Sequence, residues 1–222
     1  MHETVKIITI QKVARNVRRY VVERPAGYDF TPGQATELSI DAPRWANEKR
    51  PFTFTGLEGA EHLEFTIKSY LDHDGMTKAL WDVAPGDRLV LREPWGTIQY
   101  KGPGTFIAGG AGVTPFIAIL RALREAGQLA GNRLIVSNRT AADIILRDEF
   151  EAMDGLEVLW TLTDDPASEG VLHERIDEAF LRKHVHDVSQ NFYLCGPDAM
   201  VKDLRDGLEG LGATTEALIW EK

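Results

Sequence analysis

The sequence predicts a two-part fold, with an antiparallel β-barrel or sandwich first and a parallel α/β domain second. Up to about residue 100, short runs alternate apolar and polar side chains, which is typical of strands with one buried face. Beyond that point short apolar runs alternate with stretches of helical periodicity, which is typical of a parallel sheet with helical crossovers. Between the two patterns lies a linker, Lys101-Gly102-Pro103-Gly104, so we predict domains at 1–101 and 102–222.

The elements follow in order along the chain. In the first part we expect strands at 5–10, 19–22, 34–40, 51–55, 63–69 and 88–92, with one helix at 76–83. In the second part we expect five parallel strands at 105–108, 134–137, 156–163, 192–195 and 217–220. The helices between them are expected at 115–126, 143–153, 173–184 and 198–211.

Composition excludes several classes of protein. Hydrophobic residues make up 43% of the 222 residues, enough for a packed core, and the net charge of −9 disfavours nucleic acid as a partner. The single cysteine, Cys195, forms no internal disulfide and holds neither an iron–sulfur cluster nor a structural zinc. No apolar run is long enough to span a bilayer, and the N-terminus lacks a signal-peptide core. We therefore expect a cytoplasmic protein without a metal site.

A glycine-rich segment joins the first strand of the second part to its first helix. It reads Gly109-Gly110-Ala111-Gly112-Val113-Thr114-Pro115. Glycines allow a pyrophosphate to approach the backbone closely, and a helix N-terminus offers free N–H groups to an anion. The segment therefore predicts a dinucleotide site, although a proline stands where the dehydrogenase fingerprint has its third glycine. Taken alone, a plain strand–helix turn is the alternative.

Two further segments accompany this one in a specific order. Arg50-Pro51-Phe52-Thr53 lies upstream on a predicted strand, and Leu194-Cys195-Gly196-Pro197 lies downstream at the end of another. Together the three resemble the ferredoxin–NADP reductase family, in the compact bacterial form known as flavodoxin or ferredoxin reductase. The resemblance covers nearly the whole chain. It implies an antiparallel flavin-binding β-barrel followed by a five-stranded parallel α/β domain that binds NAD(P).

The resemblance implies that the first part holds FAD. Arg50 would pair with the flavin phosphates, Phe52 would pack on the ring where the family usually has tyrosine, and Thr53 would hydrogen-bond near flavin N5. Gly75-Met76-Thr77 matches the family's second phosphate-binding turn, with a simple helix cap as the alternative. The expected FAD-binding residues are Arg50, Pro51, Phe52, Thr53, Ile67, Lys68, Ser69, Gly75, Met76, Thr77 and Trp220. Glu216 is a second candidate, beside Trp220, for the other face of the flavin.

The resemblance also assigns the nicotinamide site. Cys195 would lie beside nicotinamide C4, although a free cysteine is often only a small buried residue. Thr53 and Cys195 are therefore the expected catalytic residues. The expected NAD(P)-binding residues are Gly110, Gly112, Val113, Thr114, Pro115, Arg139, Asp164, Cys195, Gly196, Pro197, Asp198 and Met200.

Coenzyme choice depends on two charged residues. Asp164, after the third predicted strand, repels a 2′-phosphate and accepts a hydrogen bond from a ribose hydroxyl, which favours NADH. Arg139, after the second, is suited to a 2′-phosphate and argues for NADPH. We predict NADH as the preferred substrate, with NADPH also possible.

These features predict an oxidoreductase that passes hydride from NAD(P)H to FAD and then single electrons to a separate acceptor, namely flavodoxin, ferredoxin or an oxygenase component. An NAD(P)H:free flavin reductase is one alternative, disfavoured by the phosphate-binding Arg50. A non-catalytic redox sensor is another, disfavoured by Thr53 and Cys195. We expect a monomer that binds neither nucleic acid nor membrane.

Overall fold

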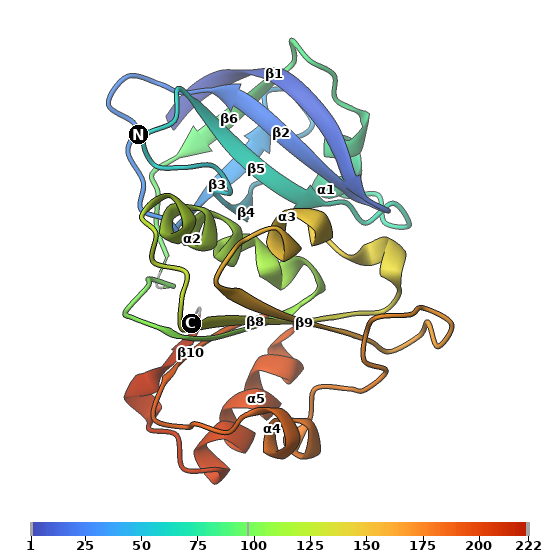
Figure 1. Ribbon diagram of the computed structural model, residues 1–222. Coiled ribbons are helices and arrows are strands. Elements are labelled where there is room, and N and C mark those ends of the chain that lie inside the picture. The colour runs from blue at the N-terminus through green and yellow to red at the C-terminus, as the bar shows by residue number, and fades with distance from the viewer. Residues whose placement is uncertain (1, 97, 221–222) are drawn as a thin grey trace. The chain divides into compact units, whose positions relative to one another are not determined.

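The computed structural model describes residues 2–96 and 98–220 (Figure 1). By their contacts the residues fall into two compact units. The first contains Met1–Gln99 and Thr114–Ala122, and the second contains Tyr100–Val113 and Leu123–Lys222. The helix that follows the glycine-rich segment therefore packs with the first unit. The domain boundary after residue 101 stays a prediction.

The first unit is built on a six-stranded antiparallel sheet with the strand order β4-β3-β6-β1-β2-β5. Its elements are β1 (His2–Ala14), β2 (Val17–Glu23), β3 (Ala35–Ile40), β4 (Arg50–Thr53), β5 (His62–Lys68), α1 (Met76–Asp82) and β6 (Arg88–Arg92). The two edge strands meet just beyond β4, where Phe54 pairs with Phe65 and the Thr55 N–H donates to the Glu64 C=O at 2.8 Å. This contact closes the sheet, so the predicted antiparallel barrel is confirmed.

Alternate side chains of these strands fill the barrel, as the apolar–polar alternation predicts. The core cluster contains Tyr20, Leu38, Phe65 and Leu89, none of which is exposed. Burial raises the pKa of the Tyr20 hydroxyl to about 12. That hydroxyl donates to the Leu80 C=O of α1 at 2.8 Å, so the neutral phenol holds α1 against β2.

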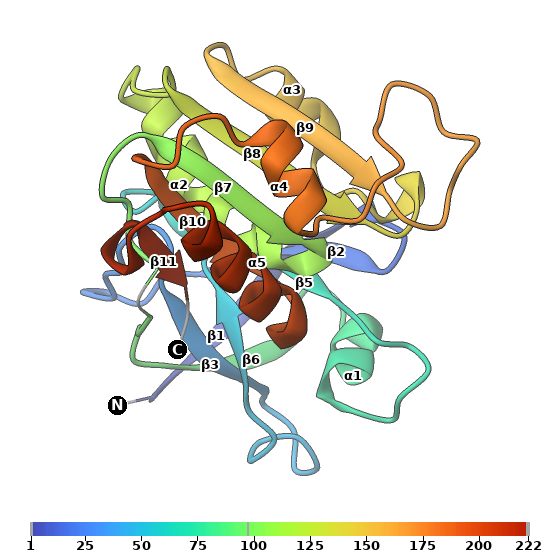
Figure 2. The same ribbon diagram turned by 90° about the horizontal axis from the view of Figure 1, so that it is seen from below.

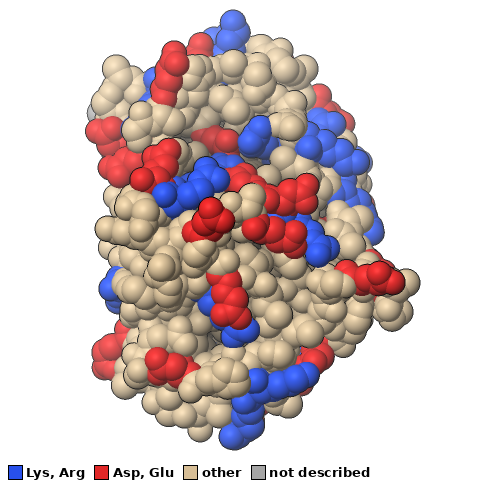
Figure 3. Space-filling model, in the orientation of Figure 1, with Lys and Arg blue, Asp and Glu red and all other residues tan. Residues whose placement is uncertain are grey.

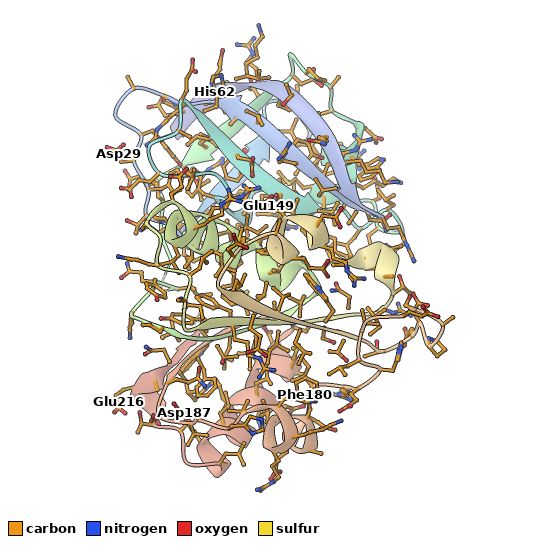
Figure 4. The ribbon with its side chains drawn as sticks, viewed as in Figure 1. Asp29, His62, Glu149, Phe180, Asp187 and Glu216 are labelled. Atoms are coloured by element: carbon orange, nitrogen blue, oxygen red, sulfur yellow. The ribbon has the colours of Figure 1, made fainter. Side chains whose placement is uncertain are left out.

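The second unit contains a five-stranded parallel sheet with the order β11-β10-β7-β8-β9, as predicted. The remaining elements of the chain are β7 (Gly104–Gly109), α2 (Thr114–Glu125), β8 (Asn132–Asn138), α3 (Arg147–Glu151), β9 (Leu156–Leu162), α4 (Glu178–His184), β10 (Asn191–Cys195), α5 (Asp198–Gly210) and β11 (Leu218–Trp220). Helices α4 and α5 cover one face of the sheet (Figure 2). Phe180 of α4, which Figure 4 labels, and Leu208 of α5 belong to one buried apolar cluster with Ile107 and Ile135 of the sheet.

Two predicted helices are wrong in extent. The predicted helix 173–184 begins only at Glu178, because Leu172 forms backbone hydrogen bonds with Trp160 and Leu162 and so extends alongside β9. Asp177 caps the helix that does form by accepting from the Phe180 N–H at 2.9 Å. The predicted helix 143–153 is interrupted at Leu146, whose φ of 54° lies in the left-handed region.

Charged side chains of both signs are mixed on the face of the molecule in Figure 3. Exposed ion pairs one helical turn apart occur on the helices, such as Arg182–Glu178 on α4 and Lys202–Asp206 on α5. Water and salt screen such exposed pairs, so they add little to the stability of the fold. Within residues 2–96 and 98–220, no helix has the length and apolar character needed to cross a membrane.

Candidate flavin and nucleotide sites

The two segments predicted to contact flavin lie along the seam of the barrel, the line where its edge strands β4 and β5 face each other. β4 and β5 are the two edges of the sheet, and they meet at the Phe54–Phe65 pair. If the antiparallel register is continued outward from that pair, Phe52 stands opposite Ile67 and Pro51 opposite Lys68. Residues 50–53 and 67–69, which lie far apart in sequence, thus belong to the two edges that meet at this seam in the first unit.

The backbone of Thr53 faces this seam. The Phe54 N–H donates to the Gln34 C=O at 3.0 Å, towards β3, whereas the Thr55 N–H donates towards β5. Successive amides of a strand point in opposite directions, so the Thr53 N–H points the same way as that of Thr55. The amide position of Pro51 would point the same way, two residues before Thr53. Because proline has no N–H, it leaves no unpaired donor at this edge. The Thr53 N–H thus points into the seam, and its hydrogen bond near flavin N5 stays a prediction.

The side chains around the seam suit a flavin. Phe52 is half-buried and packs against the barrel core. The Arg50 side chain is 53% exposed, and its guanidinium donates to the Lys49 C=O at 2.8 Å. Ser69 is buried, and its hydroxyl has no hydrogen-bond partner in the described part of the chain. An apolar surface, a hydroxyl and an exposed guanidinium are the chemistry that a flavin ring with a phosphate tail needs.

The start of α1 adjoins the end of β5. The Tyr70 N–H donates to the Thr77 hydroxyl at 3.4 Å, which connects the loop after β5 to the helix. Met76 is 2% exposed and fills the barrel core, so only its backbone is available to a ligand. Gly75 has no heavy atom within 4 Å of the position of a β-carbon, so the space beside it is open. The predicted phosphate role of this turn stays a prediction.

A separate hollow of about 740 Å³ lies on the outer face of β1, β3 and β6. None of the predicted flavin residues lines it. Its lining mixes basic and acidic side chains, and Lys49 and Glu37 form an ion pair within it at 2.7 Å. A hollow of this open, mixed-charge kind does not have the apolar lining that a flavin ring requires.

In the parallel sheet the chain order reverses between β7 and β10. From β7 the chain continues to β8 and β9 on one side, whereas β10 and β11 lie on the other. Sheets of this kind bind ligands outside the carboxyl ends of the strands at such a reversal. The glycine-rich segment follows β7 at this point, and Cys195-Gly196-Pro197 ends β10 beside it. The structure thus brings the two predicted nucleotide segments together.

Close backbone contacts explain the glycines there. A β-carbon on Gly112 would lie 2.3 Å from the carbonyl oxygen of Cys195. One on Gly109 would lie 2.6 Å from the Met200 sulfur. Gly110 has a φ of 53°, in the left-handed region that favours glycine. Glycine at these positions lets the two backbones pass this closely, and the same lack of a side chain allows a pyrophosphate to approach the turn.

Arg139 and Asp164 follow the adjacent strands β8 and β9 at the same edge of the sheet. The Arg139 Nε donates to Asp164 at 2.7 Å, and this hydrogen bond raises the pKa of the guanidinium above its usual range. The Asp164 N–H also donates to the Arg139 C=O at 2.9 Å. Asp164 was interpreted as favouring NADH and Arg139 as favouring NADPH, but the two residues form an ion pair with each other. The arginine already has an anion beside it.

The C-terminal candidates lie in the second unit. Trp220 pairs with Leu194 along β11 and β10, and the Arg205 guanidinium lies 3.8 Å from the centre of its ring. Glu216 is exposed in a short 3₁₀ turn (Figure 4), and Asp198 is exposed at the start of α5. The flavin role of Trp220 stays a prediction, and its ring already carries a cation on one face.

Sequence reasoning missed a buried charged group, Arg121 of α2. It is 7% exposed and makes hydrogen bonds to Thr55 and Glu64 of the barrel unit. A signal was available, since Arg121 is the one charged residue between Thr114 and Leu123. A lone arginine in an otherwise apolar helix requires a buried partner.

Known proteins match both parts of the chain. Residues 4–100 match the oxidoreductase FAD-binding domain, and residues 106–206 match the oxidoreductase NAD-binding domain. The reductase component of propane 2-monooxygenase from Rhodococcus jostii strain RHA1 is 29% identical over 219 residues, covering 89% of this chain and 56% of the relative. NADH-cytochrome b5 reductase 1 of Eremothecium gossypii is 32% identical, covering 73% of this chain and 62% of the relative. The chain thus spans little more than half the length of these relatives.

Among solved structures, a ferredoxin NADP+ reductase from Neisseria gonorrhoeae with bound FAD and NADP has the same fold. The TM-score is 0.86 at 20% identity, covering 99% of this chain and 98% of the other. The two domain matches and the fold define an oxidoreductase that binds FAD and a nicotinamide dinucleotide. More particularly, the chain belongs to the ferredoxin–NADP reductase family.

Proposed function

We propose that this chain takes hydride from NADH onto FAD and delivers electrons singly to a separate acceptor protein. The observation that carries the proposal is the pair of barrel edges that meet at Phe54 and Phe65, with Phe52 and the Thr53 backbone on one edge and residues 67–69 following the other. Bound FAD supplies the conversion of a two-electron donor into single electrons. The names of relatives, which include an oxygenase reductase component, support an oxygenase component, ferredoxin or flavodoxin as acceptor.

In this proposal the residues act by binding and orientation. Arg50 binds the flavin phosphates, Phe52 supports the ring, and Thr53 donates a hydrogen bond near the atom that accepts hydride. The glycine-rich segment holds the dinucleotide pyrophosphate, and Cys195 limits where the nicotinamide can lie. No proton transfer by a side chain is needed for hydride to move, which is consistent with the absence of a histidine from the set.

The decisive experiment is an absorbance spectrum of the purified protein, followed by anaerobic addition of NADH and, separately, NADPH. A yellow protein whose flavin bands bleach faster with NADH is the expected result. Release of the flavin on simple gel filtration would instead favour a free flavin reductase. A colourless protein that takes up no added FAD would contradict the proposal.

Coenzyme preference is proposed to depend on the pairing of Arg139 with Asp164. We expect Asp164→Ser to raise kcat/KM for NADPH by about 10-fold and to lower that for NADH, because the freed guanidinium can bind a 2′-phosphate. Steady-state kinetics with both coenzymes measure the change. The double variant Asp164→Ser/Arg139→Ala is the control and should lose the gain. An unchanged NADPH to NADH ratio in Asp164→Ser would contradict this assignment.

We further propose a cytoplasmic monomer. The single cysteine needs no oxidising compartment. Charges of both signs are interspersed on the face seen in Figure 3, and this favours a protein that does not self-associate. Analytical ultracentrifugation of the purified chain tests the monomeric state, and a mass above 24.8 kDa that depends on concentration would contradict it.

A further inference from the structure

Helix α2 carries a buried arginine whose partners lie in the barrel. Arg121 is the one charged residue between Thr114 and Leu123, and it is 7% exposed. Its Nη1 donates to the Thr55 C=O at 2.7 Å and to Glu64 Oε1 at 2.6 Å. A buried charge is stable only when it is paired and hydrogen-bonded, so these contacts fix the helix at one place on the barrel.

The partners form a small network at the closed end of the seam. Glu64 Oε1 also accepts from the Thr55 hydroxyl at 2.8 Å, and that hydroxyl lies 3.1 Å from the hydroxyl of Thr66. The Thr55 N–H donates to the Glu64 C=O in the same place. Arg121 therefore binds the backbone of Thr55, two residues beyond Thr53, where the chain that follows β4 pairs with β5.

Packing reinforces this attachment. A β-carbon on Gly33 would lie 3.1 Å from Cδ1 of Ile119, so α2 passes close to the barrel backbone. Val113 and Thr114 are neighbours in the chain, yet Val113 belongs to the second compact unit and Thr114 to the first. The glycine-rich segment is therefore held by the Cys195 turn on one side and continues into a helix of the barrel unit on the other.

We propose that Arg121 is a positioning residue for hydride transfer. By binding Thr55 and Glu64 it holds the first part of α2, which includes Thr114 and Pro115 at the end of the predicted nucleotide segment, against the strand that carries Thr53 within the first compact unit. This inference rests on the proposed function, because it concerns the transfer of hydride from a nicotinamide to a flavin. Such transfer is sensitive to placement, and an error of about 1 Å far from the chemistry can cost roughly 100-fold in rate.

The test separates positioning from stability by means of two variants of the flavin-loaded protein. Arg121→Met leaves Glu64 with a partly buried charge and lowers the melting temperature. The double variant Arg121→Met/Glu64→Gln removes that charge, so the melting temperature returns towards the wild-type value. We expect both variants to reduce their flavin about 10- to 100-fold more slowly with saturating NADH in anaerobic stopped-flow measurements. FAD content and the Kd for NAD+ should stay within about twofold, because neither site contains Arg121.

Arg133→Met is the control for loss of an arginine paired with a glutamate, since Arg133, whose side chain is 20% exposed, lies 2.9 Å from Glu157 on the parallel sheet. It should reduce its flavin at the wild-type rate. The proposal is overturned if the rate recovers with the melting temperature in the double variant, or if Arg121→Met is as fast as wild type. Should Arg121→Met not fold, the double variant decides, together with Arg121→Lys, which should give an intermediate rate. A wild-type flavin that NADH does not reduce would overturn the proposed function instead, before any variant is made.

Discussion

Replacing Gly112 by alanine should reduce NADH-dependent flavin reduction by about 100-fold or more and leave FAD bound. The added β-carbon would lie 2.3 Å from the Cys195 carbonyl oxygen and 2.5 Å from its carbonyl carbon. Both are backbone atoms, so either the glycine-rich segment or the Cys195 turn must move. Because both segments are predicted to hold the dinucleotide, either movement disrupts the site. Stopped-flow reduction of the flavin by NADH measures the loss, and the visible spectrum reports FAD.

Gly210→Ala is the matched control. Gly210 ends α5, is exposed, and has no heavy atom within 4 Å of the position of a β-carbon. Alanine favours a helix over glycine by up to about 1 kcal/mol, so this variant should be as active as wild type and no less stable. A Gly112→Ala protein that binds NAD+ and reduces its flavin at the wild-type rate would show that the segment is only a turn.

Replacing Arg50 by alanine should weaken FAD binding by roughly 10- to 100-fold, the effect of losing charge-assisted hydrogen bonds to a phosphate. The guanidinium is half-exposed at the start of the edge strand β4, beside the seam. Its present contacts are the Lys49 carbonyl and, at 3.5 Å, the Glu48 carboxylate, both of which a phosphate can replace at little cost. Titration of the FAD-free protein with FAD, followed by fluorescence quenching, gives the two dissociation constants.

Arg88→Ala controls for loss of an exposed arginine from the same sheet. Arg88 lies on β6, 3.8 Å from the Asp41 carboxylate, and is not among the predicted flavin residues. Its FAD affinity should match that of the wild type. Equal FAD affinity in the Arg50→Ala protein would remove Arg50 from the site and would weaken the assignment of the whole β4 segment.

The order of the elements was predictable because it depends on local periodicity. Alternation over two residues predicted the barrel strands, and apolar runs separated by helical periodicity predicted the parallel sheet. The errors arose where a distant segment outweighed local preference. Residues 173–177 were expected in a helix, but the chain just before them is held at the edge of β9 by the backbone hydrogen bonds of Leu172 with Trp160 and Leu162, and the helix begins only at Glu178.

The sequence predicted which segments belong to the candidate site, but it did not predict how they are arranged in space. Motif order alone picked out residues 50–53, 109–115 and 194–197. It did not reveal that residues 50–53 stand across a seam from residues 67–69, or that Arg139 and Asp164 form an ion pair. Nor did it reveal the partners of Arg121.

What the sequence by itself determined is the class of chemistry. Three local features carry that information. They are the glycines at a strand–helix turn, the arginine that precedes an aromatic residue and a threonine, and the cysteine at a strand end. The tertiary structure alone decided which of these groups face one another. The edges of two strands form a seam only when the sheet closes. The buried Arg121 pairs with a carboxylate that lies 57 positions away in the chain. Contacts between segments so distant depend on how the whole chain packs, which no local pattern encodes.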